Sequence, residues 1–211
     1  MKGIRAFGEN EGGLNHCGDF ALLFSPLLPQ LADVAAFHPN VTFSEFYAVG
    51  APDNFEEIVN GLSEELAQLD LRSPEEKRKR VEPYYRPGFF PKFASYVEDD
   101  WNEILCFKPP FPEYPRIFNI AFSEEARSRN YSALRKLYRS LQFFAYFRNI
   151  DACWWEFYAP HDELIAAVQQ HLAAHRLEYE ELDFEVDYPF GGLKKKRRFA
   201  GVHSIWPPES N

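Results

Sequence analysis

Hydrophobic and polar positions alternate most clearly in the last third to half of the chain, where short aromatic runs are separated by segments of helical spacing. This pattern predicts two helices, one that begins after Ser123 and one over residues 160–176. It predicts four strands around them, at residues 116–122, 143–148, 152–159 and 179–188. The order β-α-β-β-α-β is that of a ferredoxin-like fold. We therefore expect a mixed α/β (α+β) protein, with an antiparallel-rich sheet and helices on one face.

The N-terminal part of the chain shows weaker versions of the same pattern. A short edge strand is expected at residues 2–7, and a continuous apolar run predicts a buried strand at 20–24. A helix over residues 25–37 and a strand over 41–49 follow. Asp53 and Glu56 then have the spacing of a capping box, which predicts the start of another amphipathic helix.

The middle of the chain is rich in proline and in aromatic residues. Eight of the sixteen prolines lie between Pro74 and Pro115, and proline at this density prevents long helices and central strands. The segment 84–93 also holds five aromatic residues, which a flexible linker would not carry. We expect an ordered excursion over residues 73–115, packed by these side chains.

The sequence Glu-Phe-Tyr-Ala occurs twice, at residues 45–48 and 156–159, each time between a predicted strand and a predicted helix. The aromatic runs upstream of the two copies, 20–24 and 143–147, are also alike. This indicates a pseudo-repeat of two α/β halves, residues 1–72 and 116–211, which the excursion joins within one compact domain. The alternative is a chance likeness between aromatic strands.

The composition indicates a folded chain, and the net charge indicates which classes of partner it can bind. The chain has 211 residues, of which 45% are hydrophobic and 26% charged, and this excludes general disorder. A net charge of −9 repels nucleic acid and anionic lipid, so we expect neither as a partner. The same charge suits a basic partner protein, although solubility alone also explains an acidic chain. Oligomeric state is not indicated.

The cysteines and the N-terminal segment indicate a cytoplasmic setting. Cys17, Cys106 and Cys153 form neither a disulfide framework nor a zinc-binding pattern. The N-terminal residues lack the apolar run of a signal peptide, and no segment has the length and apolarity of a transmembrane helix. We therefore expect a protein of the cytoplasm.

Candidate catalytic and metal-binding residues are few. His171 and His175 share one face of a predicted helix and could chelate a metal, but no third ligand is identified, and histidines near a helix C-terminus also favour its dipole. His16 and Cys17 adjoin each other without an evident base. The basic run 194–198 could bind nucleic acid or simply neutralise the acidic strand before it. No phosphate-binding loop or hydrolase motif occurs, so we expect no cofactor and no catalytic residue.

Aromatic residues interleaved with arginine are typical of protein interfaces. On this basis the candidate partner-binding residues are Tyr85, Arg86, Phe89 and Trp155. The segment Trp-Trp-Glu-Phe-Tyr at 154–158, in an acidic α/β chain of this size, loosely resembles bacterial immunity proteins, which neutralise a cognate toxin. The resemblance implies a non-enzymatic binding module with an immunity or inhibitor role. The alternative is an enzyme or small-molecule binder with a cleft between the two halves.

Overall fold

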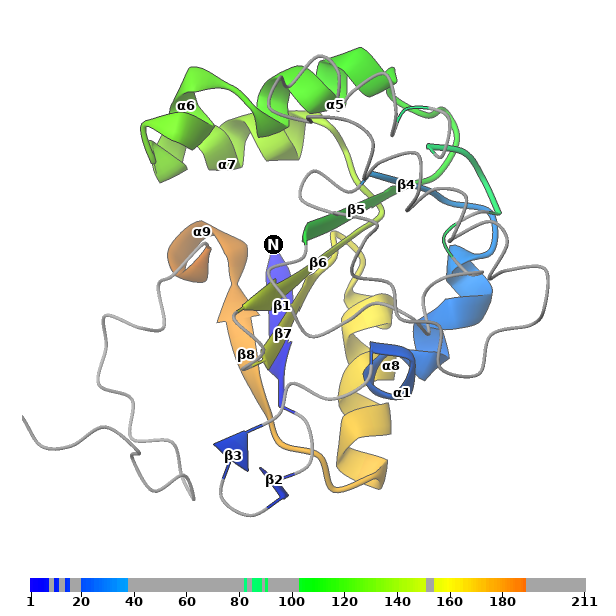
Figure 1. The fold of residues 1–211 in the computed structure, drawn as a ribbon. Coiled ribbons are helices and arrows are strands. Elements are labelled where there is room, and N and C mark those ends of the chain that lie inside the picture. Colours follow the sequence, from blue (N-terminus) through cyan, green and yellow to red (C-terminus); the bar gives the residue numbers. More distant parts are fainter. Residues whose placement is uncertain are drawn as a thin grey trace, which may run out of the picture.

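The computed structural model describes residues 1–7, 10–11, 14–15, 20–37, 82, 85–88, 90, 103–150 and 154–188. Its centre is a six-stranded sheet of order β4-β5-β6-β7-β1-β8, in which every neighbouring pair is antiparallel (Figure 1). The strands are β1 (Lys2–Ala6), β4 (Ala35–Phe37), β5 (Glu103–Phe107), β6 (Ala145–Ile150), β7 (Trp154–Tyr158) and β8 (Tyr179–Asp183). Two further short strands, β2 (Asn10–Glu11) and β3 (Leu14–Asn15), pair only with each other.

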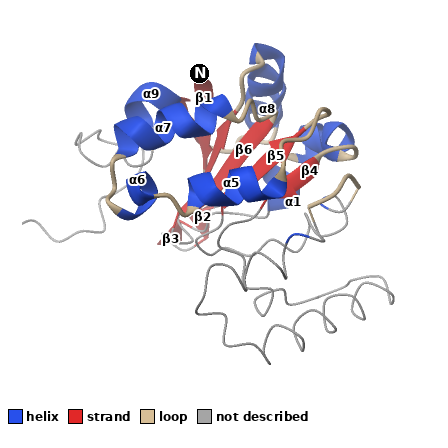
Figure 2. Cartoon of the chain, turned by 90° about the horizontal axis from the view of Figure 1, so that it is seen from above, coloured by secondary structure: helices blue, strands red, loops and turns tan. Residues whose placement is uncertain are grey.

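Helices cover both faces of the sheet, so the prediction of helices on one face is wrong (Figure 2). One apolar cluster joins the sheet to α1 (Phe20–Leu23), the 3-10 helix η1 (Ser25–Leu31) and α8 (Asp162–Ala174). A second cluster, on the opposite face, joins it to α5 (Tyr114–Ala121), α7 (Tyr131–Ser140) and α9 (Phe184–Asp187), while α6 (Glu124–Arg127) packs against α7. Two covered faces explain why the strands read as continuous apolar runs.

The elements with the strongest local patterns are confirmed. Helix α8 buries Leu164, Ile165, Val168 and Leu172, which lie on one helical face. Ser123 caps α6 as predicted, because its side chain accepts a hydrogen bond from the Ala126 backbone N–H. The single helix expected after Ser123 is divided into α6 and α7, because Arg129 has a positive φ of 57°. The two strands expected at 143–148 and 152–159 are β6 and β7, and they are neighbours in one sheet.

Residues 116–122 were expected to form a strand, and this prediction is wrong because they belong mostly to helix α5. Tyr114, Ile117 and Phe118 are buried at helical spacing, and Pro115 sits in the first turn, where its missing N–H costs nothing. The strand before this helix is β5, which lies inside the proline-rich segment 73–115 and is almost wholly buried. From β5 onward the elements run β-α-β-β-α-β, but this strand order does not confirm the ferredoxin-like arrangement.

Three expectations for the N-terminal part also need correction. Residues 20–24 contain a helix, α1, rather than a strand, and the segment 25–37 divides into the 3-10 helix η1 and strand β4. Pro26 and Pro29 remove backbone donors there, which disfavours a regular α-helix. Strand β1 lies between β7 and β8 and is therefore not an edge strand.

The first Glu-Phe-Tyr-Ala copy, the capping box at Asp53 and the basic run 194–198 lie outside the described residues, and the division into two halves stays a prediction.

One face of the sheet carries a row of five charged side chains of alternating sign, which we call the charge row. Each member stands directly opposite the next on neighbouring strands, in the order Glu103, Arg148, Glu156, Arg5, Glu180. The four nitrogen–oxygen distances along the row are 3.2, 3.2, 2.9 and 3.1 Å. The side chains of Arg5, Glu156 and Arg148 are only 3%, 1% and 4% exposed, so each buried charge is compensated by its neighbours across the sheet.

Tyrosines surround the charge row on the same face. The Tyr146 hydroxyl donates to Glu103 at 2.9 Å, and the Tyr158 hydroxyl donates to Glu156 at 3.0 Å. The Arg148 guanidinium lies over the Tyr188 ring, 4.9 Å from its centroid. Burial raises the pKa of all three tyrosines, which keeps their hydroxyl groups neutral. Burial opposes the charged form of Arg148, but Tyr146, Glu103 and Glu156 outweigh it and raise the pKa of its guanidinium.

Gly3 leaves the space that the Tyr158 ring occupies. Gly3 stands opposite Tyr158 in the sheet, and a Cβ atom on Gly3 would overlap that ring. Because Gly3 has no side chain, the Tyr158 ring can lie across β1 beside the charge row.

We expect Glu156→Gln to destabilise the fold strongly, because it removes the central negative charge from between two buried arginines. The free energy of unfolding should fall by about 3–5 kcal/mol, measured by urea denaturation. The matched control is Glu180→Gln, at the partly exposed end of the row, which should cost about 1 kcal/mol or less. If the two variants lost the same free energy of unfolding, the buried Glu156 would contribute no more to stability than the partly exposed Glu180.

Gly3→Ala should also destabilise the protein, because the added methyl group overlaps the Tyr158 ring. We expect a loss of about 1–3 kcal/mol in the same measurement. Lys2→Ala is the control, since Lys2 is exposed and makes only a surface ion pair with Asp162. A Gly3→Ala variant as stable as the control would show that the tyrosine ring is free to move away.

Candidate functional site

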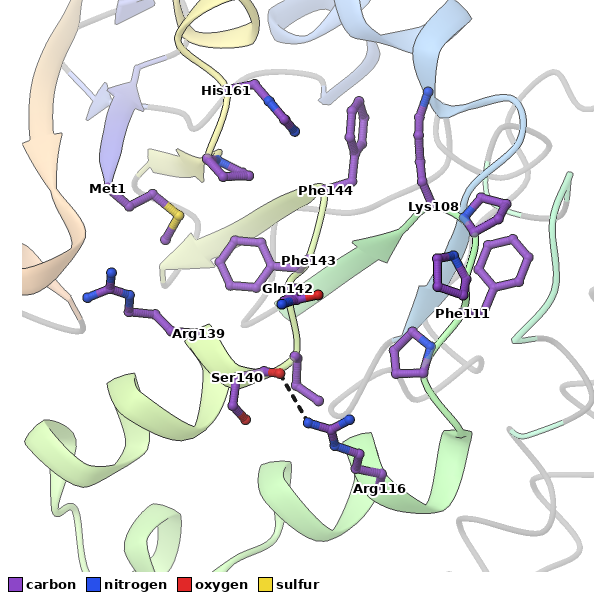
Figure 3. A pocket seen from close by; sticks show the side chains of 15 residues that line it. Met1, Lys108, Phe111, Arg116, Arg139, Ser140, Gln142, Phe143, Phe144 and His161 are labelled. Carbon is purple, nitrogen blue, oxygen red and sulfur yellow. Dashed lines mark hydrogen bonds between the residues drawn. The ribbon is translucent and has the colours of Figure 1, made fainter.

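A groove with a volume of about 870 Å³ lies at one edge of the central sheet (Figure 3). It is lined by the loop after β5, the end of α7 with the loop before β6, the loop before α8, one residue of α5 and the first residue of the chain. The lining residues are Met1, Lys108, Pro109, Pro110, Phe111, Pro112, Arg116, Arg139, Ser140, Leu141, Gln142, Phe143, Phe144, Pro160 and His161.

The antiparallel order of the strands brings these distant segments together. Strands β5 and β7 end at the same edge of the sheet at which β6 and β1 begin, because neighbouring strands run in opposite directions. The loops that leave or enter these strand ends are therefore adjacent in space, although they span positions 108 to 161. The groove is a direct consequence of the sheet topology.

The ionisable side chains that line the groove are all basic. They are Lys108, Arg116, Arg139 and His161, and the lining contains no aspartate or glutamate. Arg116 donates to the Ser140 carbonyl at 3.1 Å. The other three have carboxylate neighbours outside the lining, at Asp33, Glu185 and Glu163, with nitrogen–oxygen distances of 3.5, 2.9 and 3.8 Å.

The remaining walls of the groove are apolar. The Phe144 ring lies between two of the basic groups: the Lys108 ammonium is 4.5 Å from its centroid, and the His161 ring centroid is 6.2 Å away. Phe111 and Phe143 add aromatic surface. The four prolines in the lining have no free backbone N–H and restrict the loops that carry them. The groove thus combines positive charge with a stiff apolar wall.

Tyr85, predicted from the sequence to bind a partner, contacts the loop that forms this wall and supports it. Its hydroxyl donates to the Pro112 carbonyl at 3.1 Å, and its ring packs against Phe107 and Tyr114 with centroid distances of 6.1 and 5.6 Å. Burial raises the pKa of Tyr85. The side chain is half-buried and the neighbouring Arg86 is exposed. A direct role for either residue in binding stays a prediction, and Phe89 lies outside the described residues.

Trp155 is a core residue, so its prediction as a partner-binding residue is wrong. It is fully buried and packs edge-on against Phe20, with a centroid distance of 5.1 Å. The adjacent Trp154 points to the other face, where the Arg5 guanidinium lies 4.9 Å from its ring centroid. The neighbouring tryptophans therefore serve the two faces of the sheet, as the alternation of a strand requires.

The histidine pair on α8 ties this helix to α1 and η1. Nε2 of His171 lies 2.8 Å from the Leu22 carbonyl and 3.2 Å from the Ser25 hydroxyl, so the carbonyl contact requires a proton on that nitrogen. His175 contacts the His171 carbonyl through Nδ1 at 2.9 Å. Within the described residues, no group of three or more histidine, cysteine, aspartate or glutamate side chains could hold a metal ion.

Cys106 is the one cysteine among the residues that the structure describes. His16 and Cys17 lie outside the described residues. Cys106 is fully buried, and burial raises the pKa of its thiol, so this side chain is an unreactive part of the core.

None of the four basic residues of the groove was predicted as a site residue from the sequence, because no local pattern marks residues that converge from different loops. The charge row did leave a local signal. Arg148 and Glu156 are opposite charges inside two apolar strands joined by a predicted turn, which is the pattern of a buried cross-strand pair.

Comparisons with protein-family models, with curated protein sequences and with solved structures found no match for this chain. Among the helices that the structure describes, none has both the length and the apolarity needed to cross a membrane.

We expect Tyr85→Ala to weaken the wall of the groove and to reduce the free energy of unfolding by about 2–3 kcal/mol, since it removes a half-buried ring and a hydrogen bond. Tyr85→Phe keeps the ring and should cost about 1 kcal/mol. Urea denaturation measures both, and Tyr179→Phe on the exposed edge of β8 is the control. If Tyr85→Ala were as stable as the wild type, Tyr85 would not brace the wall.

Proposed function

We propose that this chain is a non-enzymatic binding protein, and that its groove holds an acidic segment of a partner protein. The observation that carries the proposal is the segregation of charge. The whole chain has a net charge of −9, yet the groove is lined by four basic side chains and no carboxylate. The carboxylates that neighbour three of these groups, Asp33, Glu163 and Glu185, lie outside the lining, and this separation of charge supports a negatively charged ligand within the groove.

The nature of the basic groups supports recognition of carboxylates. Arginine presents several N–H donors in a planar fork that matches a carboxylate, whereas lysine and protonated histidine add charge with less geometric demand. The groove has two arginines, Arg116 and Arg139, together with Lys108 and His161. Its phenylalanine and proline walls suit the apolar side chains of a peptide rather than an inorganic ion.

The polar side chains of the groove do not form a catalytic arrangement. The Ser140 hydroxyl donates its hydrogen bond to the Leu137 carbonyl at 2.6 Å, within the last turn of α7. His161 is exposed, and no carboxylate within the lining orients its ring. Nucleophilic catalysis needs a nucleophile and a base within hydrogen-bond reach of each other, and a third group that orients the base. This supports binding without chemistry.

The cellular role that we propose follows the loose resemblance to immunity proteins: an immunity or inhibitor protein that neutralises a partner in the cytoplasm. The net negative charge of the chain supports steering toward a partner of positive net charge. The basic groove supports an acidic segment on that same partner. These two features are compatible, because long-range steering depends on total charge and docking depends on local charge.

A small anionic molecule is the second candidate ligand. A volume of about 870 Å³ falls within the range of small-molecule sites. The groove lies at one edge of the sheet, so it does not require the cleft between two halves that the sequence suggested.

We expect the double variant Arg116→Gln/Arg139→Gln to bind a fluorescein-labelled, glutamate-rich peptide at least about tenfold more weakly than the wild type, measured by fluorescence anisotropy at low salt. The control is Lys136→Gln/Arg176→Gln, which removes two exposed positive charges outside the groove lining. It changes the net charge equally and should have little effect.

Three results would contradict the proposal. The peptide does not bind the wild type, the two double variants weaken binding equally, or both variants are folded and bind the peptide with unchanged affinity. Circular dichroism spectra of both variants establish that each is folded before affinities are compared.

A further inference from the structure

We infer that the free edge of strand β8 is a docking surface for an extended basic segment, and that its occupant is the chain's own run Lys-Lys-Lys-Arg-Arg at residues 194–198. No residue of β8 lines the groove, so this surface is separate from the proposed binding site. The run itself lies outside the described residues.

Strand β8 has backbone hydrogen-bonding groups without a partner on its outer side. It is the last strand of the sheet, and among the described strands it pairs only with β1 (Figure 1). The Phe184 N–H donates to the Met1 carbonyl at 2.9 Å, so the backbone groups of the even-numbered residues of β8 face β1. Those of Tyr179 and Glu181 point outward, where no described residue bonds to them. These four groups are a template for one more strand.

The C-terminal end of this outer side is already closed. The Asp183 N–H also points outward, but it donates to the Asp187 carboxylate of α9 at 2.8 Å. A further strand can therefore bond to Tyr179 and Glu181, but it cannot bond to the Asp183 N–H. The open part of the edge is short enough for a run of five residues to cover it.

The charge row gives a second and independent reason for a basic occupant. Its signs alternate across the sheet and end on β8 with Glu180, which is 21% exposed and pairs with Arg5 at 3.1 Å. Three carboxylates and two guanidinium groups form the row, so one negative charge is not compensated within it. A basic side chain beside Glu180, on a strand added to β8, would continue the alternation.

Acidic side chains lie on both faces of β8. The Glu181 carboxylate accepts a hydrogen bond from the Gln169 amide of α8 at 2.9 Å, and no described residue forms an ion pair with it. Glu180 lies on the opposite face, in the charge row. Because successive side chains of a strand point to opposite faces, a run of basic residues alone places positive charge on both faces in any register. The exposed Tyr179 ring adds apolar surface for the stem of a lysine.

The length of the connection allows the run to reach this edge. Tyr188, the last described residue, follows α9 at the C-terminal end of β8. The six residues from Pro189 to Lys194 span about 20 Å when extended, which exceeds three strand spacings of about 4.8 Å. Proline and the pair Gly191–Gly192 favour a turn in this connection. A turn there would lead the run back along β8 in the antiparallel direction.

Other occupants fit the edge less well. Two copies of β8 side by side would place Glu180, Glu181 and Asp183 of one chain against those of the other, and like charges on neighbouring strands destabilise a sheet. A basic segment of another protein has the right sign. The chain's own run has the same sign, and its short tether gives it an effective concentration on the order of millimolar.

The test is amide hydrogen–deuterium exchange, measured by nuclear magnetic resonance on the full-length chain. The wild type is compared with a variant in which Gln replaces all five basic residues of 194–198. The amides of Tyr179 and Glu181 report on the outer side of β8. Those of Glu180 and Leu182 face β1 and show in the same spectra that the strand is folded. Arg129→Gln/Lys136→Gln, which removes exposed positive charge elsewhere, is the control.

We expect the amides of Tyr179 and Glu181 to exchange at least about tenfold more slowly in the wild type and in the control than in the five-Gln variant, because docking hydrogen-bonds both amides. The difference should shrink in about 1 M NaCl, which screens the attraction between exposed charges. Nuclear Overhauser contacts between β8 and residues 194–198 would identify the run as the added strand.

Equal exchange of these two amides in the wild type and the five-Gln variant, whether fast or slow, would overturn the inference. Slower exchange that appears only as the protein concentration rises would assign the edge to a second copy. Slower exchange that appears only after a pentalysine peptide is added to the wild type would assign it to a basic segment of another protein. Either result would overturn the run as the occupant. The proposed function is tested separately, because these measurements involve no ligand of the groove.

Discussion

The charge row is the constraint on which the arrangement of this sheet depends. Three of its members are almost fully buried, and a buried charge without a partner costs several kcal/mol. All pairs are satisfied only when five strands adopt one register, because a shift of one residue would move each charge to the opposite face. Arg5 also needs a carboxylate on both sides, from β7 and from β8. This requirement gives a physical reason for the N-terminal strand to lie inside the sheet rather than at its edge.

The same register positions the groove, since the strand ends at one edge follow from it. The loops after β5 and β7 bring Lys108 and His161 to this edge, and the loop before β6 brings Phe144. The tyrosine and phenylalanine cluster beneath α5 and α7 holds the helices that carry the two arginines. A disturbance of the buried charges would therefore reach the groove through the strands, although the charge row itself does not line it.

The parts of the fold that could be predicted from the sequence are those with a strong local pattern, such as α8, α7, β6 and β7. The errors arose where tertiary packing decides. The segment 114–121 has aromatic residues that fit a strand as well as a helix, and only Pro115 in the first turn indicates the helix. Strand β5 lies within a proline-rich segment, where no strand was predicted, and the inner position of β1 depends on pairing with residues from Trp155 to Tyr158, far along the chain. The groove could not be predicted for the same reason, whereas the pairing of Arg148 with Glu156 could.

The rim of the groove explains how a basic site is tolerated in the unbound protein. Asp33, Glu163 and Glu185 lie outside the lining, each is exposed, and each neighbours one of the basic groups. Such pairs contribute little to stability, but they reduce the repulsion among the four basic side chains. Under the function proposed above, a ligand carboxylate would exchange with these rim carboxylates rather than enter an uncompensated field. Its affinity would then depend on what the rim cannot supply, namely apolar contact with Phe144 and the N–H donors of Arg116.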